Sequence, residues 1–308
     1  AGEITNWSQL GGEDRPLRVL GAEEGSAQRM FFEDKVLGPR RAAADITDLG
    51  SEPEIAAAVV ADPAAIGYVG HIHQRNAKAL PLVSACGIVA APTAFGAKTG
   101  QYPLDRRLYL YASESGLTRE MRAFLDFASG PQADAAIVKA GFVDLGVGRI
   151  EQGAVADRVH AEMVEADSYE AGAMQALLDE LYRWDRLSVT LRFDAASMQL
   201  DARDERELGR LVAYLAALPE GTQVAFAGFT DDAGPFDGNR ALSLRRAEQS
   251  AAALLARGAG RLDGLDISAF GFGEMAPVGC NTSAEGRRAN RRVEVWIRTP
   301  GDTVVAAI

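Results

Sequence analysis

The chain has 308 residues, with 32 Lys and Arg against 43 Asp and Glu, so its formal net charge is −11. This length indicates two domains, each large enough to bury its own core. A composition of 47% hydrophobic and 24% charged residues excludes a disordered, collagen-like or coiled-coil chain. The acidic balance argues against nucleic-acid binding, which needs a basic face, and no apolar run reaches the roughly 18 residues that a membrane span requires. The first residues show no signal-peptide pattern.

Strand and helix patterns alternate through the first part of the chain. Short apolar runs bounded by turn residues predict strands at 17–20, 65–69 and 108–111. Apolar residues at helical spacing predict helices at 30–37, 54–60, 121–127 and 133–139. This alternation predicts an α/β layer in a first domain of residues 1–147.

Residues 148–186 have a different pattern. Their apolar side chains lie at approximately helical spacing between Val164 and Trp184, with acidic residues in between. We interpret this segment as an amphipathic, acidic helical connector that joins the two domains.

The last part, residues 187–308, alternates strands and helices again. Residues 187–193 alternate apolar and polar side chains, which is typical of a half-buried strand. Further strands are predicted at 224–230, 265–272 and 292–297, and helices at 208–218 and 244–255. The order β-α-β-α-β-β predicts an α+β domain with its helices packed on one face of a mixed sheet.

The cysteines and histidines give weak signals. Cys86 and Cys280 are far apart in the sequence and are expected in different domains, so free thiols are favoured over a disulfide. His71 and His73 would share one face of a strand, as metal ligands can. Because no third ligand accompanies them, no metal and no other cofactor is predicted.

Several motifs within residues 228–294 carry a family resemblance. In chain order they are GFTDDAG (228–234), NRALSLRRA (239–247), GFGE (271–274), NT (281–282) and EGRRANRRVE (285–294). Together they resemble the OmpA-like (OmpA/Pal/MotB C-terminal) peptidoglycan-binding domain, over residues 187–299. The resemblance implies that Asp231 binds the ammonium, and Arg246 the carboxylate, of diaminopimelate in the peptidoglycan stem. The further pocket positions that it implies are Thr230, Asn239, Leu242 and Ala247.

The residues themselves allow two interpretations of this pair. Asp231 follows a strand and Arg246 lies in the next helix, so one rim could place both within a few Å and suit a zwitterion. The alternative is that the two form a salt bridge that fixes the loop. Phe229 stands where many relatives have His, and its ring is expected to pack at the pocket rim. Arg291 and Arg292 are expected to bridge the last strand to loop carbonyls and Glu side chains.

The first part of the chain carries a second resemblance. Its motifs are GEITNWSQLGG (2–12), EEGS (23–26), AIGYVG (65–70), YPL (102–104), FLDF (124–127) and GFV (141–143). They resemble the PstS-like phosphate-binding proteins of the type II periplasmic receptor fold, over residues 2–147. The resemblance implies an oxyanion site at Gly25 and Ser26.

Two departures from that family weaken the implied site. Ala22 stands where the family has an Arg, so a bidentate phosphate partner is missing. The matched region also lacks the first half-lobe of the receptor, so the two-lobed cleft is expected to be incomplete. The apolar residues Leu108, Leu110, Phe124 and Phe127 would then need another cover. The candidates are the helix within 164–184 and a second copy of the chain, in a homodimer.

The combined prediction is a non-enzymatic protein of the periplasm, associated with the cell wall or outer membrane. Its OmpA-like domain would bind peptidoglycan and its receptor-like domain would be presented in the periplasm. The alternative is a wall-tethered receptor for phosphate or another small oxyanion that serves ABC-type uptake. An enzyme is disfavoured because no nucleophile–base pair, phosphate-binding loop or metal set is found.

Overall fold

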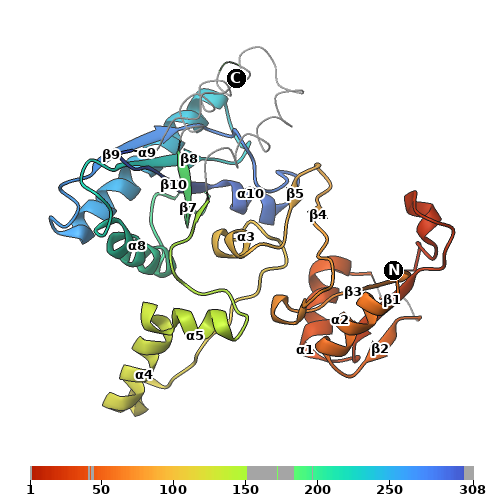
Figure 1. Cartoon of the computed structure of the whole chain (residues 1–308). Helices are drawn as coiled ribbons and strands as arrows, with labels where there is room; N and C mark the ends of the chain where they lie inside the picture. The colour runs from red at the N-terminus through yellow and green to blue at the C-terminus, as the bar shows by residue number, and fades with distance from the viewer. Residues whose placement is uncertain are drawn as a thin grey trace. The chain divides into compact units, whose positions relative to one another are not determined.

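The computed structural model describes residues 2–40, 42, 45–150, 172, 184–195 and 197–301 (Figure 1). The chain divides into two compact units. Unit 1 comprises Ala1–Pro81 and Pro103–Leu145, and unit 2 comprises Leu82–Tyr102 and Gly146–Ile308. The predicted connector helix, within 164–184, lies outside the described residues except for Gly172 and Trp184.

Unit 1 contains a small parallel sheet in the order β2-β1-β3. Its core is formed by Leu20 and Ala22 from β1 and by Ile55 from α2. The Ser51 hydroxyl caps the start of α2 by accepting a hydrogen bond from the Glu54 amide at 3.4 Å, so the helix begins where an N-cap residue precedes the apolar run. The strands are β1 Arg18–Ala22, β2 Thr47–Leu49 and β3 Ala65–Gly67. The helices are α1 Ala27–Phe32, which continues into a π-type turn at Glu33–Leu37, α2 Glu52–Ala61, α4 Arg119–Ser129 and α5 Asp134–Lys139.

Two local predictions for unit 1 are wrong. Residues 108–111 form no strand in the described structure, and Tyr111 is 91% exposed, because no neighbouring strand pairs with this apolar run. His71 and His73 lie in a 3-10 turn, His71–His73, instead of on one face of a strand. The other short 3-10 helices of this unit are Trp7–Leu10, Glu114–Gly116 and Pro131–Ala133.

Unit 2 is built on a mixed sheet in the order β6-β7-β10-β8-β9 (Figure 1). Strands β8 and β9 are parallel and the other neighbouring pairs are antiparallel. The predicted β-α-β-α-β-β order is confirmed, with the edge strand β6 and the short helix α10 in addition. The strands are β6 Arg149–Ile150, β7 Asp185–Arg192, β8 Gln223–Phe229, β9 Asp266–Gly271 and β10 Arg292–Arg298. The helices are α8 Ala202–Leu215, α9 Phe236–Gly258 and α10 Ala284–Asn290.

The two faces of this sheet differ in chemistry. On one face, Leu187, Val189 and Leu191 of β7 pack with apolar residues of α8 and α9 in the main core. On the other face, the alternate residues Ser188 and Thr190 are also buried, so the prediction of a half-buried strand is wrong. Helix α3, Ala94–Thr99, contacts β7, which also corrects the expectation that helices cover only one face.

Helix α3 belongs to a segment that we call the strap, residues Leu82–Tyr102. The strap begins with an antiparallel hairpin of β4 Leu82–Val83 and β5 Val89–Ala90 and ends with α3. A disulfide joins Cys86 in this hairpin to Cys280. The expectation of free thiols is therefore wrong, because the strap folds into the same compact unit as Cys280.

Candidate functional site

Asp231 lies just after the end of β8, where the chain leaves the sheet. The preceding Thr230 amide donates a hydrogen bond to the Gly273 carbonyl at 2.7 Å, which fixes this exit. Asp231 is 9% exposed as a residue, and its Oδ2 accepts a hydrogen bond from Arg291 Nη1 at 2.6 Å. The carboxylate is therefore almost buried and is already paired with one guanidinium.

Arg246 projects from α9 and is fully buried. Its Nε donates to the Ser197 carbonyl at 3.0 Å and its Nη2 to the Asp194 carbonyl at 3.1 Å, while the ring of Phe193 lies 5.0 Å from the guanidinium carbon. Nη1 has no hydrogen-bond partner among the described residues. Burial, and after it the Arg291 charge, lowers the pKa of Arg246 to about 10.

The Asp231 charge opposes that shift, because it favours the protonated guanidinium. No ion pair joins Asp231 directly to Arg246 in the described part of the chain, and the carboxylate pairs with Arg291 instead. The alternative of a simple Asp231–Arg246 salt bridge is therefore wrong. Two guanidinium groups, those of Arg246 and Arg291, lie in the electrostatic field of the Asp231 carboxylate.

The other predicted pocket residues are placed differently. The Thr230 hydroxyl is buried without a hydrogen-bond partner among the described residues, close in sequence to Asp231. Asn239 Nδ2 donates to Glu274 Oε2 at 2.5 Å. Leu242 is half-buried, and Ala247 lies in the main core. The structure thus places Arg246 within the electrostatic influence of Asp231, the residue after Thr230, whereas Ala247 packs among apolar side chains.

Two glycines bring α9 close enough to the sheet to form this site. A Cβ at Gly228 would lie 2.0 Å from the Ser243 carbonyl oxygen, and one at Gly271 would lie 2.5 Å from the Leu244 amide nitrogen. Only glycine at these strand positions permits so close an approach. The approach fixes where Arg246, one turn further along α9, lies relative to the end of β8.

Arg291 and Arg292, which follow α10, have different partners. Arg292 donates to Glu294 Oε1 at 2.7 Å and to the Ala276 carbonyl at 2.8 Å, which confirms its predicted bridging role. Arg291 bonds a carbonyl, that of Phe193 at 3.0 Å, but its acidic partner is Asp231. Its place in the candidate site was missed, and the only available signal was the basic run around it.

Phe229 does not lie at the rim of the site. Its ring is fully buried, lies 5.6 Å from that of Phe272 and is covered by the Arg292 guanidinium at 4.1 Å. Phe229 is directly opposite Arg292 in the sheet, so both side chains belong to the interior of unit 2. The prediction of a rim position is wrong for this reason.

The implied anion site in unit 1 is a short helix start. Ser26 caps α1, and its hydroxyl accepts a hydrogen bond from the Arg29 amide at 3.3 Å. The Arg29 side chain is bonded to Glu33 at 2.8 Å and Asp48 at 2.5 Å, so its charge is neutralised within the fold. Gly25 adopts φ 81°, the left-handed conformation that the turn requires.

The side chains and helices of the described residues bear on metal and membrane binding. Within these ranges no cluster of three or more His, Cys, Asp or Glu side chains is arranged to hold a metal ion. None of the described helices has the length and apolar character needed to cross a bilayer.

The last part of the chain resembles known envelope proteins. The OmpA family model matches residues 192–291. The probable lipoprotein YiaD of Escherichia coli is 36% identical over 105 residues, which are 34% of this chain and 46% of YiaD. The peptidoglycan-binding protein ArfA of Mycobacterium tuberculosis is 38% identical over 94 residues, 30% of this chain and 28% of ArfA. YfiB of Escherichia coli is 33% identical over 114 residues, 37% of this chain and 69% of YfiB.

The first part resembles a different class of protein. A PBP superfamily domain model matches residues 1–131. The phosphate-binding protein PstS of Bacillus subtilis is 30% identical over 140 residues, 44% of each chain. The chain therefore spans less than half the length of YiaD, ArfA and PstS, and each likeness concerns one part of it.

Proposed function

We propose a function from the families to which the chain belongs, the PBP superfamily over residues 1–131 and the OmpA family over residues 192–291. It is a non-enzymatic cell-envelope protein that binds peptidoglycan through Asp231 and Arg246 and presents a receptor-like domain in the periplasm. Its place is at the cell wall or outer membrane. The name of ArfA, a peptidoglycan-binding relative, supports this assignment.

The observation that carries the proposal is Nη1 of Arg246, which has no hydrogen-bond partner among the described residues. A buried charged donor without an acceptor is costly, and a ligand carboxylate would supply the missing acceptor. Among the described residues, Asp231 accepts a hydrogen bond only through Oδ2, from Arg291, which leaves Oδ1 to receive an ammonium. Diaminopimelate carries a carboxylate and an ammonium on one carbon, so a single group of the stem peptide fits both residues.

Access to the site requires a local change. The carbonyls of Asp194 and Ser197 hold the Arg246 guanidinium on the side away from the core, and the residue is fully buried. The backbone at these two residues must move for a ligand to reach Nη1. Binding then gives Nη1 a carboxylate acceptor, in a hydrogen bond whose donor and acceptor are both charged.

The test is a pull-down with purified sacculi that compares Asp231→Asn, Arg246→Lys and the double Ala variant with the wild type. Each substitution removes the charge or the guanidinium group that would hold the ligand in a nearly buried site, so we expect binding at least roughly 30-fold weaker. Asp232→Asn is the matched control, because Asp232 is the adjacent residue and is exposed. Unchanged binding by a folded double Ala variant would contradict the proposal.

A second candidate is an oxyanion receptor, which the likeness of residues 1–131 to PstS favours. In that case Gly25 and Ser26 bind phosphate or another small oxyanion. The engagement of Arg29 by Glu33 and Asp48 disfavours it, since that cation is already neutralised. Calorimetry with phosphate, sulfate and molybdate, on the wild type and Ser26→Ala, tests it: a receptor gives heat that the substitution abolishes.

A further inference from the structure

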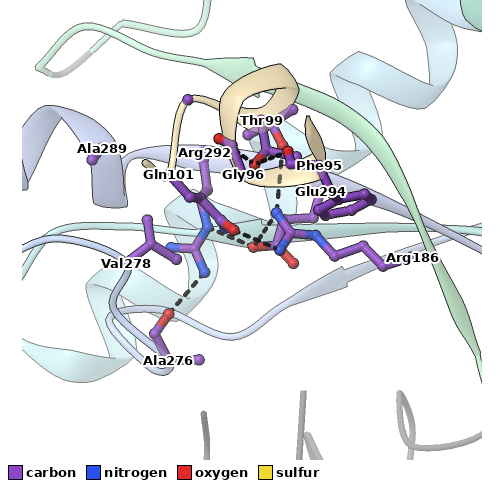
Figure 2. Close-up of polar contacts among 12 residues, drawn as sticks. Phe95, Gly96, Thr99, Gln101, Arg186, Ala276, Val278, Ala289, Arg292 and Glu294 are labelled. Atoms are coloured by element: carbon purple, nitrogen blue, oxygen red, sulfur yellow. Dashed lines mark hydrogen bonds and ion pairs between the residues drawn. The ribbon is translucent and has the colours of Figure 1, made fainter. Parts of the chain in front are cut away.

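The strap covers a charged face of the unit 2 sheet. Figure 2 shows Glu294 between two arginines, with Oε1 2.7 Å from Arg292 Nε and 3.1 Å from Arg186 Nη2. All three side chains are at most 3% exposed. The strap supplies part of their environment, because Gln101 accepts a hydrogen bond from Arg186 Nη1 at 3.1 Å and the ring of Phe95 lies 5.4 Å from its guanidinium.

This face also carries buried apolar side chains, among them Trp296, but the side chain that the strap contacts through Gln101 and Phe95 is the charged Arg186. An apolar face that loses its cover is exposed to water at a large cost in free energy. Arginine and glutamate side chains are solvated well by water, and their burial carries a desolvation penalty that exposure would relieve. The disulfide therefore holds the strap against these charged side chains, where apolar packing contributes little.

The strap is linked to both ends of α10 through two residues outside it, Cys280 and Arg192. At the start of this helix, a Cβ on Gly286 would lie 2.0 Å from the Cys280 carbonyl oxygen, so the disulfide-bonded residue is packed directly against the helix. Near its end, Arg192 Nη1 donates to the Ala289 carbonyl at 2.6 Å. The same guanidinium donates through Nη2 to the strap carbonyls of Thr99 at 2.7 Å and Gly100 at 3.0 Å.

Helix α10 leads directly into the candidate site. The buried side chain of Asn290 ties the helix end to the turn before Cys280: its Oδ1 accepts from the Val278 and Gly279 amides at 2.8 and 3.0 Å. The next residue is Arg291, whose guanidinium holds Asp231. A continuous set of contacts thus runs from the disulfide through α10 to the carboxylate.

We infer that the strap is a positioning element for Asp231 and that the Cys86–Cys280 disulfide is its redox-sensitive lock. The inference rests on the proposed peptidoglycan binding of this site. A dithiol reductant breaks the S–S bond by giving it two electrons and two protons, which yields two cysteine thiols while the dithiol becomes a disulfide. Cys86 is exposed, so a reductant reaches it. Reduction loosens the strap, then α10 and Arg291, and weakens ligand binding.

The test measures binding of the full chain to purified sacculi in the oxidised form, after reduction by a dithiol, and after reoxidation. We expect the reduced form to bind roughly 3- to 30-fold more weakly, the range by which residues along a coupling path alter a distant site. Reoxidation restores binding, a reversal that general damage to the fold would not show. The control is Cys86→Ser with Cys280→Ser, which behaves as the reduced form and ignores the reductant.

A second variant approaches the same contacts without touching the disulfide. Arg192→Met removes the hydrogen bonds to the strap and α10 carbonyls, and it weakens binding in the same direction while the disulfide is intact. If a thiol assay shows complete reduction and binding is unchanged, the inference is overturned and peptidoglycan binding stands. If neither redox form binds sacculi, the proposed function fails, and this inference fails with it.

Discussion

At the scale of single residues, Asp204 shows how the fold alters the chemistry of a carboxyl group. It lies in the first turn of α8, forms a capping box with Asp201 and is 1% exposed. Its Oδ1 also accepts a hydrogen bond from the Arg192 amide at 3.4 Å. Burial, and after it the neighbouring Asp201 charge, raises the pKa of Asp204 to about 6.

This shift predicts a stability cost at neutral pH. The pKa in the folded state, about 6, is above the ordinary value of 3.8, so the folded state binds more protons between these values and stability falls as the pH rises through them. The loss is on the order of 3 kcal/mol and is complete above pH 6. We expect Asp204→Asn to raise the melting temperature at pH 7.5 and to flatten the decline between pH 4 and 6, as measured by thermal melts.

A matched control is Asp263→Asn, which removes an exposed carboxylate from the same unit. It leaves the pH profile of melting unchanged. A wild-type profile without a decline between pH 4 and 6, or an Asp204→Asn variant with the wild-type profile, would contradict the raised pKa.

At the scale of elements, the approach of α9 to β8 and β9 determines the site. Because Gly228 and Gly271 have no side chain, the helix backbone lies directly against the strands. This contact places Arg246 of α9 within the electrostatic field of Asp231 at the end of β8.

Gly228→Ala tests this dependence. The new Cβ would be 2.0 Å from the Ser243 carbonyl, so the helix must shift, and we expect a loss of about 1–3 kcal/mol or more in the free energy of unfolding. Sacculus binding falls as well, since Arg246 moves with the helix. Gly238→Ala is the control within α9, because its nearest neighbouring atoms are 3.8 Å away. Urea unfolding measures both, and equal stability of the two variants would exclude the proposed contact.

The sequence predicts the regular elements of unit 2 because their apolar residues, at strand or helix spacing, form its main core, although the polar face of β7 is buried as well. Strands β7, β8, β9 and β10 and helices α8 and α9 all follow the patterns expected for them. The run 108–111 has an equally strong strand pattern but no partner strand in the described structure, and a pattern alone does not supply one.

The candidate site was predicted only in part. Motif spacing placed Asp231 and Arg246 near one another, but the pairing of Asp231 with Arg291 depends on how α10 ends, 60 residues further along the chain. The disulfide was missed for a similar reason. The strap has no pattern that marks it as part of unit 2, so Cys86 and Cys280 gave no signal of proximity.

At the scale of the whole molecule, the compact units and the sequence families divide the chain differently. The PBP superfamily match covers residues 1–131, yet the strap within it folds into unit 2. The domain boundaries after residues 147 and 186, which were predicted from the sequence, remain a proposal. Since the chain passes from one unit to the other at 81/82, at 102/103 and again at 145/146, neither unit is a contiguous segment.

The disulfide has one more consequence. Together with the intervening backbone, the Cys86–Cys280 bond closes a covalent ring. This ring includes Pro103–Leu145 of unit 1 and a large part of unit 2. A protease that cuts once inside this ring opens it without releasing a fragment, so the two pieces stay joined until the sulfur bridge is reduced. In an oxidising compartment the protein would therefore keep its parts together after a nick that would separate an ordinary two-domain chain.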